Sequence, residues 1–331
     1  MTFNAIFLEK HENGYFSCNI QSIPQAQLTQ QSGDTLVQIH YSSLNYKDAL
    51  ALTNKGPVVR LWPMVAGIDG VGTVVSCKTG KYNIGDKVIL NGWGCGETHW
   101  GCLSQYAYLH SDWLIPLPTS FTPYQSMAVG TAGYTAALCV QRILDFGIKP
   151  EQGPILVTGA SGGVGSYAVA LLAKLGYQVT ASSSKKSCHS YLSQLGATNV
   201  MDSRQLKDAG KPLQKEQWAA VVDVIGSHTL ANVCAQTQYG GIVTCCGLAQ
   251  GMDLPATVAP FILRGVTLAG IDSVMAPYDK RIKAWALLSQ YLDHSLLEQI
   301  AKKITLAECK DMAEQIIAGQ ITGRVVVDVN H

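Results

Sequence analysis

Hydrophobic and polar residues follow one period in the first part of the chain and another in the rest. Up to about residue 124, short runs alternate between apolar and polar residues, as at residues 35–41, 70–76 and 86–90, and glycine or proline turns separate them. This alternation predicts β-strands with one buried face. Later, apolar residues recur at helical spacing between short apolar runs. We therefore expect a β-rich domain followed by an α/β domain with a parallel, doubly wound sheet.

Residues 154–186 contain an apolar run, the glycine-rich sequence GASGGVG, a helical pattern and a second β-rich run. Strand, glycine turn, helix and strand form the βαβ unit of a dinucleotide-binding domain. The spacing of Gly159, Gly162 and Gly165 allows a tight turn, close approach of the backbone to a pyrophosphate and close packing of helix on strand. We expect the pyrophosphate at the positive end of the helix dipole. The residues predicted to contact it are Ser161, Gly162, Gly163 and Val164.

The end of the second strand indicates which dinucleotide binds. A site for NAD places Asp or Glu about 20 residues after the turn, where the carboxylate accepts hydrogen bonds from the ribose hydroxyls. This chain has three serines and two lysines at residues 182–186 and no acid. Hydroxyls and cations suit a 2′-phosphate, so NADP(H) is the predicted cofactor, bound through Ser183, Ser184 and Lys185. A solvated polar turn is the alternative.

Length, composition and charge narrow the class of protein. A chain of 331 residues exceeds one ordinary core, so two domains are expected. A net charge of +1 argues against nucleic acid or acidic lipid as the main partner. The sequence has neither an apolar run of membrane-spanning length nor a secretory signal, so no membrane association is predicted. The 10 cysteines lack C-x-x-C spacing, which is typical of reduced thiols in a cytoplasmic protein.

Five longer stretches resemble one enzyme family. They lie at residues 42–51, 63–74, 92–107, 157–165 and 260–274. Together they resemble the acrylyl-CoA reductase branch of the medium-chain dehydrogenase/reductase superfamily, which is NADPH-dependent and related to quinone oxidoreductases. The resemblance runs nearly end to end. It implies a Rossmann doubly wound parallel sheet inserted in a β-rich GroES-like catalytic domain. The predicted limits are 1–124 and 266–331 for the catalytic domain and 125–265 for the NADP-binding domain.

The same resemblance bears on metal binding. Zinc alcohol dehydrogenases of the superfamily carry Gly-His-Glu where this chain has Gly-Ile-Asp at residues 67–69, and isoleucine has no ligand atom. Of the four cysteines of a structural zinc lobe, only Cys95 and Cys102 are present, with His99 nearby. No metal site is predicted. Without metal, NADPH is best suited to add a hydride to a carbon polarised by conjugation, as in an enone, a quinone or an α,β-unsaturated thioester.

The resemblance implies catalytic and cofactor contacts. Asn45 and Tyr46 are expected at the nicotinamide, where an amide and a phenol can donate to the enolate oxygen, and Tyr46 can also supply the proton or hydrogen-bond the cofactor. A buried tyrosine with a satisfied hydroxyl is the alternative. Asp69 corresponds to an acid near the site and is expected to shape the pocket. Leu248 and Val274 follow the fifth and sixth strands and are expected to flank the nicotinamide and its ribose.

Other charged residues have two interpretations each. Lys55 and Arg60 could bind the phosphates of an acyl-CoA or lie solvated at the surface. Asp48 could orient its neighbours or end a turn. An arginine that some relatives place beyond the next short strand falls near Ser203, and Arg204 is the alternative contact for the 2′-phosphate.

The predicted function is NADPH-dependent, metal-free reduction of the activated C=C bond of an α,β-unsaturated acyl-CoA, acryloyl-CoA to propanoyl-CoA. A quinone or enone oxidoreductase on the same scaffold and a non-catalytic NADPH-binding redox sensor are the alternatives. Residues 264–274 resemble the edge strand through which the superfamily often pairs, so a homodimer is expected. The sequence leaves the acyl chain length and the identity of the proton donor open.

Overall fold

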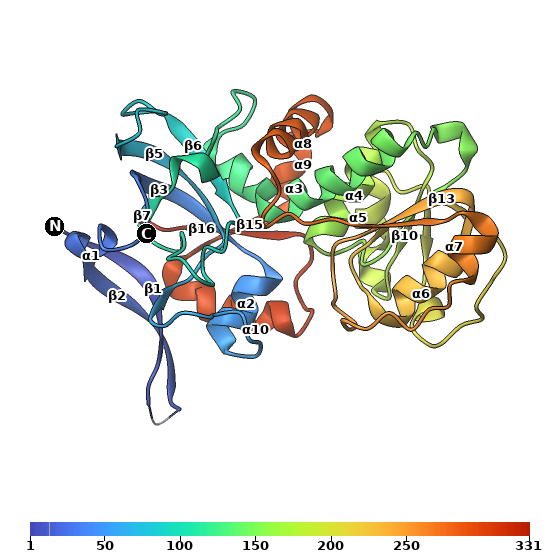
Figure 1. The fold of residues 1–331 in the computed structure, drawn as a ribbon, viewed down its shortest axis with the longest axis horizontal. Coiled ribbons are helices and arrows are strands. Elements are labelled where there is room, and N and C mark those ends of the chain that lie inside the picture. Colours follow the sequence, from blue (N-terminus) through green and yellow to red (C-terminus); the bar gives the residue numbers. More distant parts are fainter. Residues whose placement is uncertain (13) are drawn as a thin grey trace. The chain divides into compact units, whose positions relative to one another are not determined.

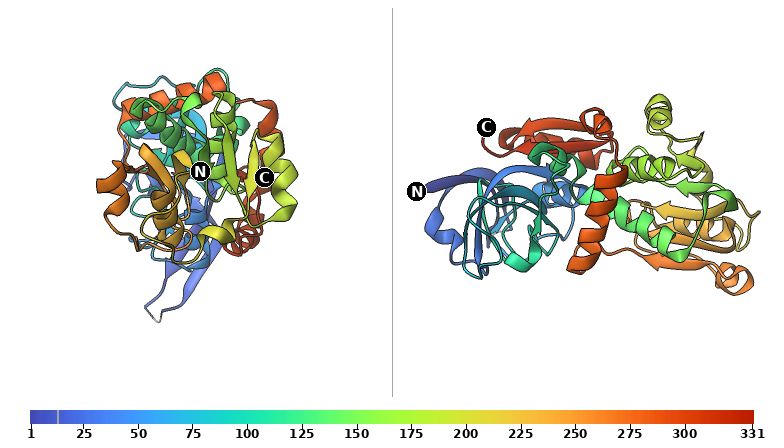
Figure 2. Two further views of the ribbon diagram at one scale, coloured as in Figure 1. Left: turned by 90° about the vertical axis from the view of Figure 1, so that its right-hand side faces the viewer. Right: turned by 90° about the horizontal axis from the view of Figure 1, so that it is seen from above.

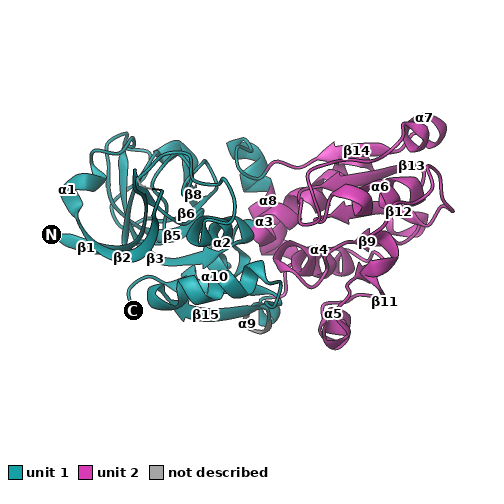
Figure 3. Ribbon diagram, turned by 90° about the horizontal axis from the view of Figure 1, so that it is seen from below, with its two compact units in different colours: residues 1–131, 273–283, 294–331 teal, residues 132–272, 284–293 magenta. Residues whose placement is uncertain are grey.

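The computed structural model describes residues 1–12 and 14–331 and divides into two compact units (Figure 3). Unit 1 comprises Met1–Thr131, Ser273–Lys283 and His294–His331, and unit 2 comprises Ala132–Asp272 and Ala284–Asp293. Sequence analysis placed the second domain at residues 125–265. Unit 2 begins at Ala132, two residues after a break at Gly130 (φ 50°, ψ −161°) in the helix there. It also extends beyond residue 265, because the next strand belongs to its sheet.

Unit 1 contains two sheets, and both ends of the chain belong to it (Figure 1). The smaller sheet has the order β2-β1-β4, and the larger has the order β15-β16-β3-β5-β6-β8 with β7 paired to β3. The strands of the two sheets are β1 (Thr2–Lys10), β2 (Phe16–Pro24), β3 (Thr35–Leu44), β4 (Met64–Val65), β5 (Asp69–Cys77), β6 (Lys87–Asn91), β7 (Tyr106–Leu109), β8 (Ile115–Pro116), β15 (Ala301–Thr305) and β16 (Arg324–Asp328). The strands expected at residues 35–41, 70–76 and 86–90 are therefore present as β3, β5 and β6.

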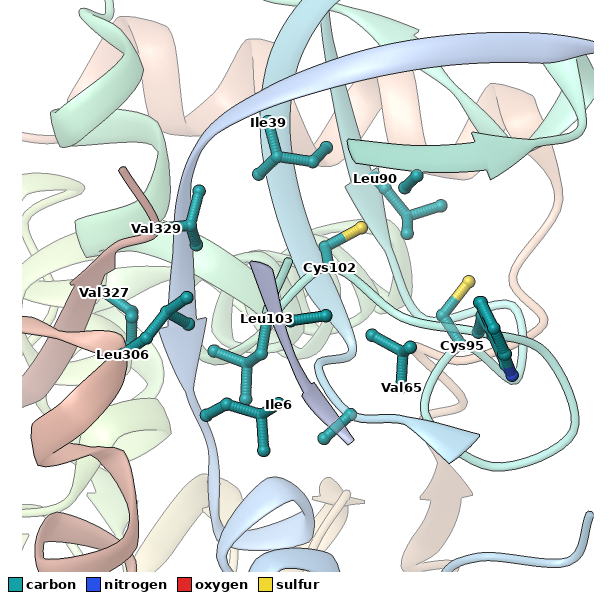
Figure 4. Close-up of a cluster of buried hydrophobic side chains, with 14 of the residues drawn as sticks. Ile6, Ile39, Val65, Leu90, Cys95, Cys102, Leu103, Leu306, Val327 and Val329 are labelled. Carbon is teal, nitrogen blue, oxygen red and sulfur yellow. The ribbon is translucent and has the colours of Figure 1, made fainter. Parts of the chain in front are cut away.

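The C-terminal strand β16 returns to the first part of the chain. It pairs antiparallel with β3, with Val325 opposite Leu44 and Asp328 opposite Tyr41. Apolar side chains from the N-terminal strands, the loop after β6 and the C-terminal segment share one buried core, as Figure 4 shows for Ile6, Leu103 and Val327. This pairing brings Arg324, the first residue of β16, next to the end of β3.

Unit 1 contains short helices, and two longer helices, at residues 123–146 and 278–291, are each divided between the two units. The helices are α1 (Gln25–Leu28), α2 (Tyr46–Thr53), α3 (Pro123–Phe146), α8 (Tyr278–Tyr291), α9 (Ser295–Ile300) and α10 (Cys309–Ile317). Helix α10 packs against α2. Among residues 1–12 and 14–331, no helix is both long and apolar enough to cross a membrane.

Unit 2 is built on one six-stranded parallel sheet with the order β11-β10-β9-β12-β13-β14. Figure 2 gives two further views of the ribbon, in which most of this unit is coloured green to orange. In chain order within the unit the strand order is 3-2-1-4-5-6, the doubly wound arrangement, whose ligands bind where the strand order reverses. Every residue of β12 is buried, which is typical of a parallel strand covered on both faces. The elements are β9 (Ile155–Val157), α4 (Gly163–Lys174), β10 (Val179–Ser182), α5 (His189–Gln194), β11 (Asn199–Met201), β12 (Trp218–Asp223), α6 (Ser227–Gln236), β13 (Thr237–Cys245), α7 (Ala259–Arg264) and β14 (Thr267–Gly270).

Candidate active site

The glycine turn between β9 and α4 requires glycine at two positions. Gly159 has a φ of +56°, and a Cβ there would lie 2.5 Å from Cγ2 of Val224. A Cβ on Gly165 would lie 2.4 Å from the carbonyl oxygen of Gly159, so α4 can approach the end of β9 only without a side chain. Gly162 is the N-cap of α4 and has no side chain to cap the helix, and no acid lies in the first turn. The free N–H groups there can bind a pyrophosphate.

The serines at the ends of the turn and of β10 lie together. The hydroxyls of Ser161 and Ser183 are 3.3 Å apart, and both residues are buried. The N–H of Lys185 donates to the Ser183 hydroxyl at 3.2 Å. Ser184 is exposed, and the buried Ser182 hydroxyl has no hydrogen-bond partner among the described residues. The hydroxyls of Ser161 and Ser183 and the backbone of Lys185 thus lie together, and hydroxyl groups can donate to a 2′-phosphate.

Arg204 is engaged with its own neighbour. Its Nε donates to both carboxylate oxygens of Asp202, at 3.0 and 2.9 Å, at the surface of unit 2. These hydrogen bonds lower the pKa of Asp202 to about 2. A 2′-phosphate would therefore compete with a carboxylate for this guanidinium. Ser203 lies between the two ion-paired residues in the same short turn.

Asp223, at the end of β12, was missed by sequence analysis. Its buried carboxylate accepts hydrogen bonds from the Thr158 hydroxyl at 2.7 Å and from the N–H of Gly226 at 2.8 Å. Burial raises the pKa of Asp223. These bonds join the carboxyl ends of β9 and β12, the two strands between which the strand order reverses. An aspartate that ends an all-apolar strand was the available signal.

A cavity of about 590 Å³ opens at the carboxyl ends of β13 and β14. Leu248, which was expected to flank the nicotinamide, lies at its wall and is 53% exposed. Val274 belongs to unit 1 instead, where its carbonyl accepts hydrogen bonds from the N–H of Trp93 at 3.0 Å and from Arg281 at 2.7 Å. The other apolar lining residues of the cavity are Leu230, Met252, Leu254 and Ile271.

Tyr46 is an accessible phenol. It is the first residue of α2 and is 47% exposed, although its neighbours in sequence, Leu44, Asn45 and Asp48, are buried. The Tyr46 hydroxyl has no hydrogen-bond partner within residues 1–12 and 14–331. Tyr46 is therefore placed as a group that can meet a ligand, and the alternative of a buried tyrosine does not apply.

Asn45 is placed differently, as a buried N-cap. Its side-chain Nδ2 donates to Asp69 Oδ2 at 2.9 Å and to Asp48 Oδ2 at 3.1 Å. Its Oδ1 accepts a hydrogen bond from Arg324 Nη1 at 3.0 Å. Both N–H groups of the amide are thus directed at carboxylates inside the protein. Sequence analysis missed Arg324, for which the only signal was a basic residue at the start of an apolar strand.

Asp69 begins β5 and has no exposed surface. One carboxylate oxygen accepts from Ser43 at 2.6 Å, Asn45 at 2.9 Å and the N–H of Thr131 at 2.8 Å. The other oxygen accepts from Asn91 at 2.6 Å and from the Thr131 hydroxyl at 2.5 Å. Asp69 therefore joins β3, β5, β6 and α3. Because Asp69 is fully buried, it can shape a pocket only through the residues that donate hydrogen bonds to it.

The nearby carboxylate of Asp48 is held by three donors. Asn45 donates to it through its backbone N–H at 2.8 Å as well as through its side chain, and the N–H of Ile68 donates at 3.0 Å. Burial raises the pKa of Asp48 to about 6. Asp48 thus orients Asn45 and the loop before β5, as one of its two interpretations required.

Lys55 and Arg60 lie at the surface of unit 1. Lys55 forms an ion pair with Glu314 of α10, with 2.5 Å between Nζ and Oε2. The backbone N–H of Arg60 donates to the carbonyl of Glu97 at 2.9 Å. An acyl-CoA phosphate would have to displace a carboxylate from Lys55, whereas no ion pair of Arg60 is present in the described part of the chain.

The residues at the position of a zinc site do not fit a metal. Ile68 offers no ligand atom, and Cys95 and Cys102 have no exposed surface. Burial raises the pKa of both thiols, which opposes the thiolate form that zinc needs. Among the described residues, no group of three or more His, Cys, Asp or Glu side chains could hold a metal ion.

Comparison with known proteins identifies relatives over nearly the whole chain. Residues 31–119 match the family model of the alcohol dehydrogenase GroES-like domain, and residues 163–290 match that of the zinc-binding dehydrogenases. The probable acrylyl-CoA reductase AcuI of Escherichia coli K12 is 48% identical, over 98% of this chain and 99% of its own length. The putative quinone oxidoreductase YhfP of Bacillus subtilis is 42% identical, over 98% of each chain.

A solved structure shows the same fold. The yhdH oxidoreductase of Salmonella enterica, crystallised in complex with NADP, is 47% identical and has a TM-score of 0.96 over 98% of this chain and 99% of its own. The predicted fold class is confirmed: a Rossmann sheet together with a β-rich GroES-like domain.

Proposed function

Because this chain belongs to the medium-chain dehydrogenase/reductase superfamily, in the branch of the acrylyl-CoA reductases and their quinone oxidoreductase relatives, we propose that it reduces the activated C=C bond of an α,β-unsaturated acyl-CoA with NADPH. The substrate that we propose is acryloyl-CoA and the product propanoyl-CoA. The observation that carries the proposal is 48% identity to a probable acrylyl-CoA reductase over 98% of the chain. The accessible Tyr46 and the glycine turn supply groups that suit this chemistry.

Unit 2 is the proposed NADPH-binding domain and unit 1 the proposed catalytic domain. Ser161, Gly162, Gly163 and Val164 would hold the pyrophosphate at the start of α4, and Ser183, Ser184 and Lys185 would hold the 2′-phosphate. Leu248 and Val274 would contact the nicotinamide half. When bound, NADPH supplies the hydride that is added to the β-carbon of the substrate.

In the proposed reaction, residues of unit 1 stabilise the developing enolate charge and supply the proton that the α-carbon receives. Tyr46 donates a hydrogen bond to the carbonyl oxygen on which enolate charge develops. Its hydroxyl is the proposed source of the proton for the α-carbon, and the exposed phenolate that remains takes a proton from solvent before the next turnover. Asn45 and Asp69 remain in the proposed site, where they hold the start of α2, the helix that Tyr46 begins. No metal takes part in the proposed reaction, because the residues at the zinc position lack suitable ligands.

We also propose a homodimer that acts in the cytoplasm. β14 is an edge strand of four uncharged residues, TLAG, and such an edge can pair with a second copy. In the segment that leads into β14, Val258, Ile262 and Leu263 are 66, 73 and 62% exposed. Apolar side chains that gather in this way are typical of an interface between copies. The cysteines are free, which suits a reducing compartment.

The test is consumption of NADPH by the purified protein with acryloyl-CoA, crotonyl-CoA and a simple quinone in parallel. Strong turnover of acryloyl-CoA, weaker turnover of the others and still weaker turnover with NADH are the expected results. Competition by free CoA would distinguish a thioester reductase from an enone reductase. Fast quinone reduction without thioester activity would instead favour the function named for YhfP. NADPH binding without any turnover would favour a redox sensor.

A further inference from the structure

The amide of Asn45 has only one orientation that its partners allow. Its oxygen accepts from Arg324 at 3.0 Å, and its nitrogen donates to Asp69 at 2.9 Å and to Asp48 at 3.1 Å. Turning the amide over would place N–H groups against a guanidinium and an oxygen against two carboxylates. The orientation of Asn45 is therefore determined by one cation and two anions. The cation comes from the far end of the chain.

Arg324 is 4% exposed and uses its whole guanidinium. Its Nε donates to the carbonyl of Ala128 at 3.2 Å, and its Nη1 donates to the carbonyl of Leu44 at 3.3 Å in addition to Asn45. Its Nη2 donates to the hydroxyl of Ser43 at 2.8 Å. A planar fork with fixed donor directions makes these contacts together, whereas the point charge of a lysine does not.

The backbone of α3 leaves space for this guanidinium. Gly130 interrupts the helix with a φ of +50°. A Cβ on Gly130 would lie 2.4 Å from Arg324 Nη2, 2.8 Å from Asp69 Oδ2 and 2.8 Å from Ser43 Oγ. Only glycine fits both the left-handed backbone and the close approach. Gly130 thus leaves a space in which the guanidinium of Arg324 fits beside Asp69.

Tyr46 depends on this arrangement for its direction. Its hydroxyl makes no hydrogen bond within the described part of the chain, so no polar contact of its own holds the phenol. The preceding residue, Asn45, is instead held through both its backbone and its side chain. The Cα–Cβ direction of Tyr46 is consequently fixed by the groups that hold Asn45 at the start of α2.

We propose that Arg324 is a positioning residue for the reduction: through the Asn45 amide it holds the start of α2 so that the Tyr46 hydroxyl meets the substrate carbonyl. This inference rests on the proposed function, because it takes the contact between Tyr46 and the substrate from there. Arg324 itself is buried and does not touch the substrate. Its effect on the rate passes through Tyr46.

A double-mutant cycle tests this route. Arg324→Lys keeps the charge and loses the fork, and we expect kcat with acryloyl-CoA to fall about tenfold while the KM for NADPH changes by less than about twofold. In the Tyr46→Phe background the same substitution should lower kcat by less than about twofold, because the hydroxyl that Arg324 positions is absent. An equal loss in both backgrounds, or no loss in either, would overturn the proposal.

A matched control and a second variant complete the cycle. Arg264→Lys changes an arginine of unit 2 that likewise donates to backbone carbonyls, those of Ala235 at 2.8 Å and Gln214 at 2.6 Å, and kcat should not change. If Arg324→Lys does not fold, Asn45→Ala takes its place, since Arg324 then retains Ala128, Leu44 and Ser43 as partners. The same dependence on the Tyr46 hydroxyl is expected, and additive losses would again contradict the proposal.

An NMR label on the phenol carbon of tyrosine separates this inference from the proposed function. The Tyr46 signal, assigned from its loss in Tyr46→Phe, should shift or broaden in Arg324→Lys and stay unchanged in Arg264→Lys. This measurement needs no turnover. If the wild-type protein fails to reduce acryloyl-CoA, the proposed function falls while the positioning of Tyr46 is still decided. An unchanged Tyr46 signal in Arg324→Lys would refute the positioning.

Discussion

The candidate cofactor site in unit 2 and the cluster around Asp69 in unit 1 are both close-packed, but backbone atoms make the close contacts in the first and polar side chains make them in the second. In unit 2, Gly159 and Gly165 bring backbone against backbone within one short turn. In unit 1, a buried carboxylate and a buried guanidinium gather side chains from β3, β5, α3 and β16. The first site depends on the absence of side chains. The second depends on hydrogen bonds among charged and polar side chains that are far apart in sequence.

Because of this difference, we expect substitutions at the two sites to have different effects. A backbone turn at a helix N-terminus can lose its ligand while the sheet behind it stays folded, because the strands contribute no side chain to it. When one partner of a buried ion pair is removed, the remaining charge stays buried without a partner, and the whole unit is destabilised. Substitutions in unit 2 should therefore act first on NADPH binding, and those in unit 1 on stability or on kcat.

The largest effect is expected from Asp69→Asn. The variant leaves Arg324 without its nearby anion, 3.8 Å away, and turns one acceptor atom into an N–H group that faces hydrogen-bond donors. We expect the free energy of unfolding to fall by about 3–5 kcal/mol, measured by urea denaturation. The control is Asp112→Asn, whose exposed ion pair with Lys81 is screened by water, so the free energy of unfolding should stay nearly unchanged. Equal losses in the two variants would remove the contrast between the buried cluster and an ordinary ion pair.

In contrast to Asp69→Asn, Gly165→Ala should act first on NADPH binding. Its Cβ would meet the carbonyl oxygen of Gly159 at 2.4 Å and push α4 away from the turn. NADPH binding, followed by cofactor fluorescence, should weaken about 100-fold, since the N–H groups at the helix start no longer converge on the pyrophosphate. Gly56→Ala is the control, because its new Cβ meets only the flexible side chain of Leu50 at 3.3 Å. Retained NADPH affinity in Gly165→Ala would contradict the location of the pyrophosphate.

The same contrast explains what sequence analysis could predict. The glycine turn lies within one βαβ unit, so its spacing, its helix and the serines after β10 were all visible as local patterns. Arg324 and Asn91 have no local signature, because their partners come from β3 and β5 and are brought near only by sheet pairing. Asn45 was predicted as a donor to the substrate, but its hydrogen-bond partners depend on those same long-range contacts. Unit 2 begins two residues after the helix break at Gly130, and the close approach of Arg324 to this glycine is another long-range contact without a local pattern.

A pH titration sharpens the comparison within unit 1. Burial raises the pKa of Asp48 from its ordinary value of 3.8 to about 6, so between these pH values the folded protein binds more protons at this site than the unfolded chain. The contribution of Asp48 to stability therefore increases as the pH falls from about 6 towards 4, by about 2 kcal/mol. The measurement is the difference in unfolding free energy between wild type and Asp48→Asn across this range. The wild type should gain stability relative to the variant on acidification. A difference that is independent of pH would show that the hydrogen bonds from the three donors to Asp48 offset the effect of its burial.

The smallest effect is expected from Lys185→Arg in unit 2. A guanidinium can donate two parallel hydrogen bonds to a phosphate where an ammonium acts as a point charge. We expect affinity for NADPH to rise about threefold and affinity for NADH, which lacks the 2′-phosphate, to stay the same. Lys186→Arg, at the exposed neighbouring lysine, is the matched control and should change neither. Equal gains for NADPH and NADH would place Lys185 away from the 2′-phosphate, and a gain in Lys186→Arg alone would assign that contact to the neighbouring residue. In either case Ser161 and Ser183 would remain beside the turn, so the result tests one side chain without disturbing the backbone site on which it depends.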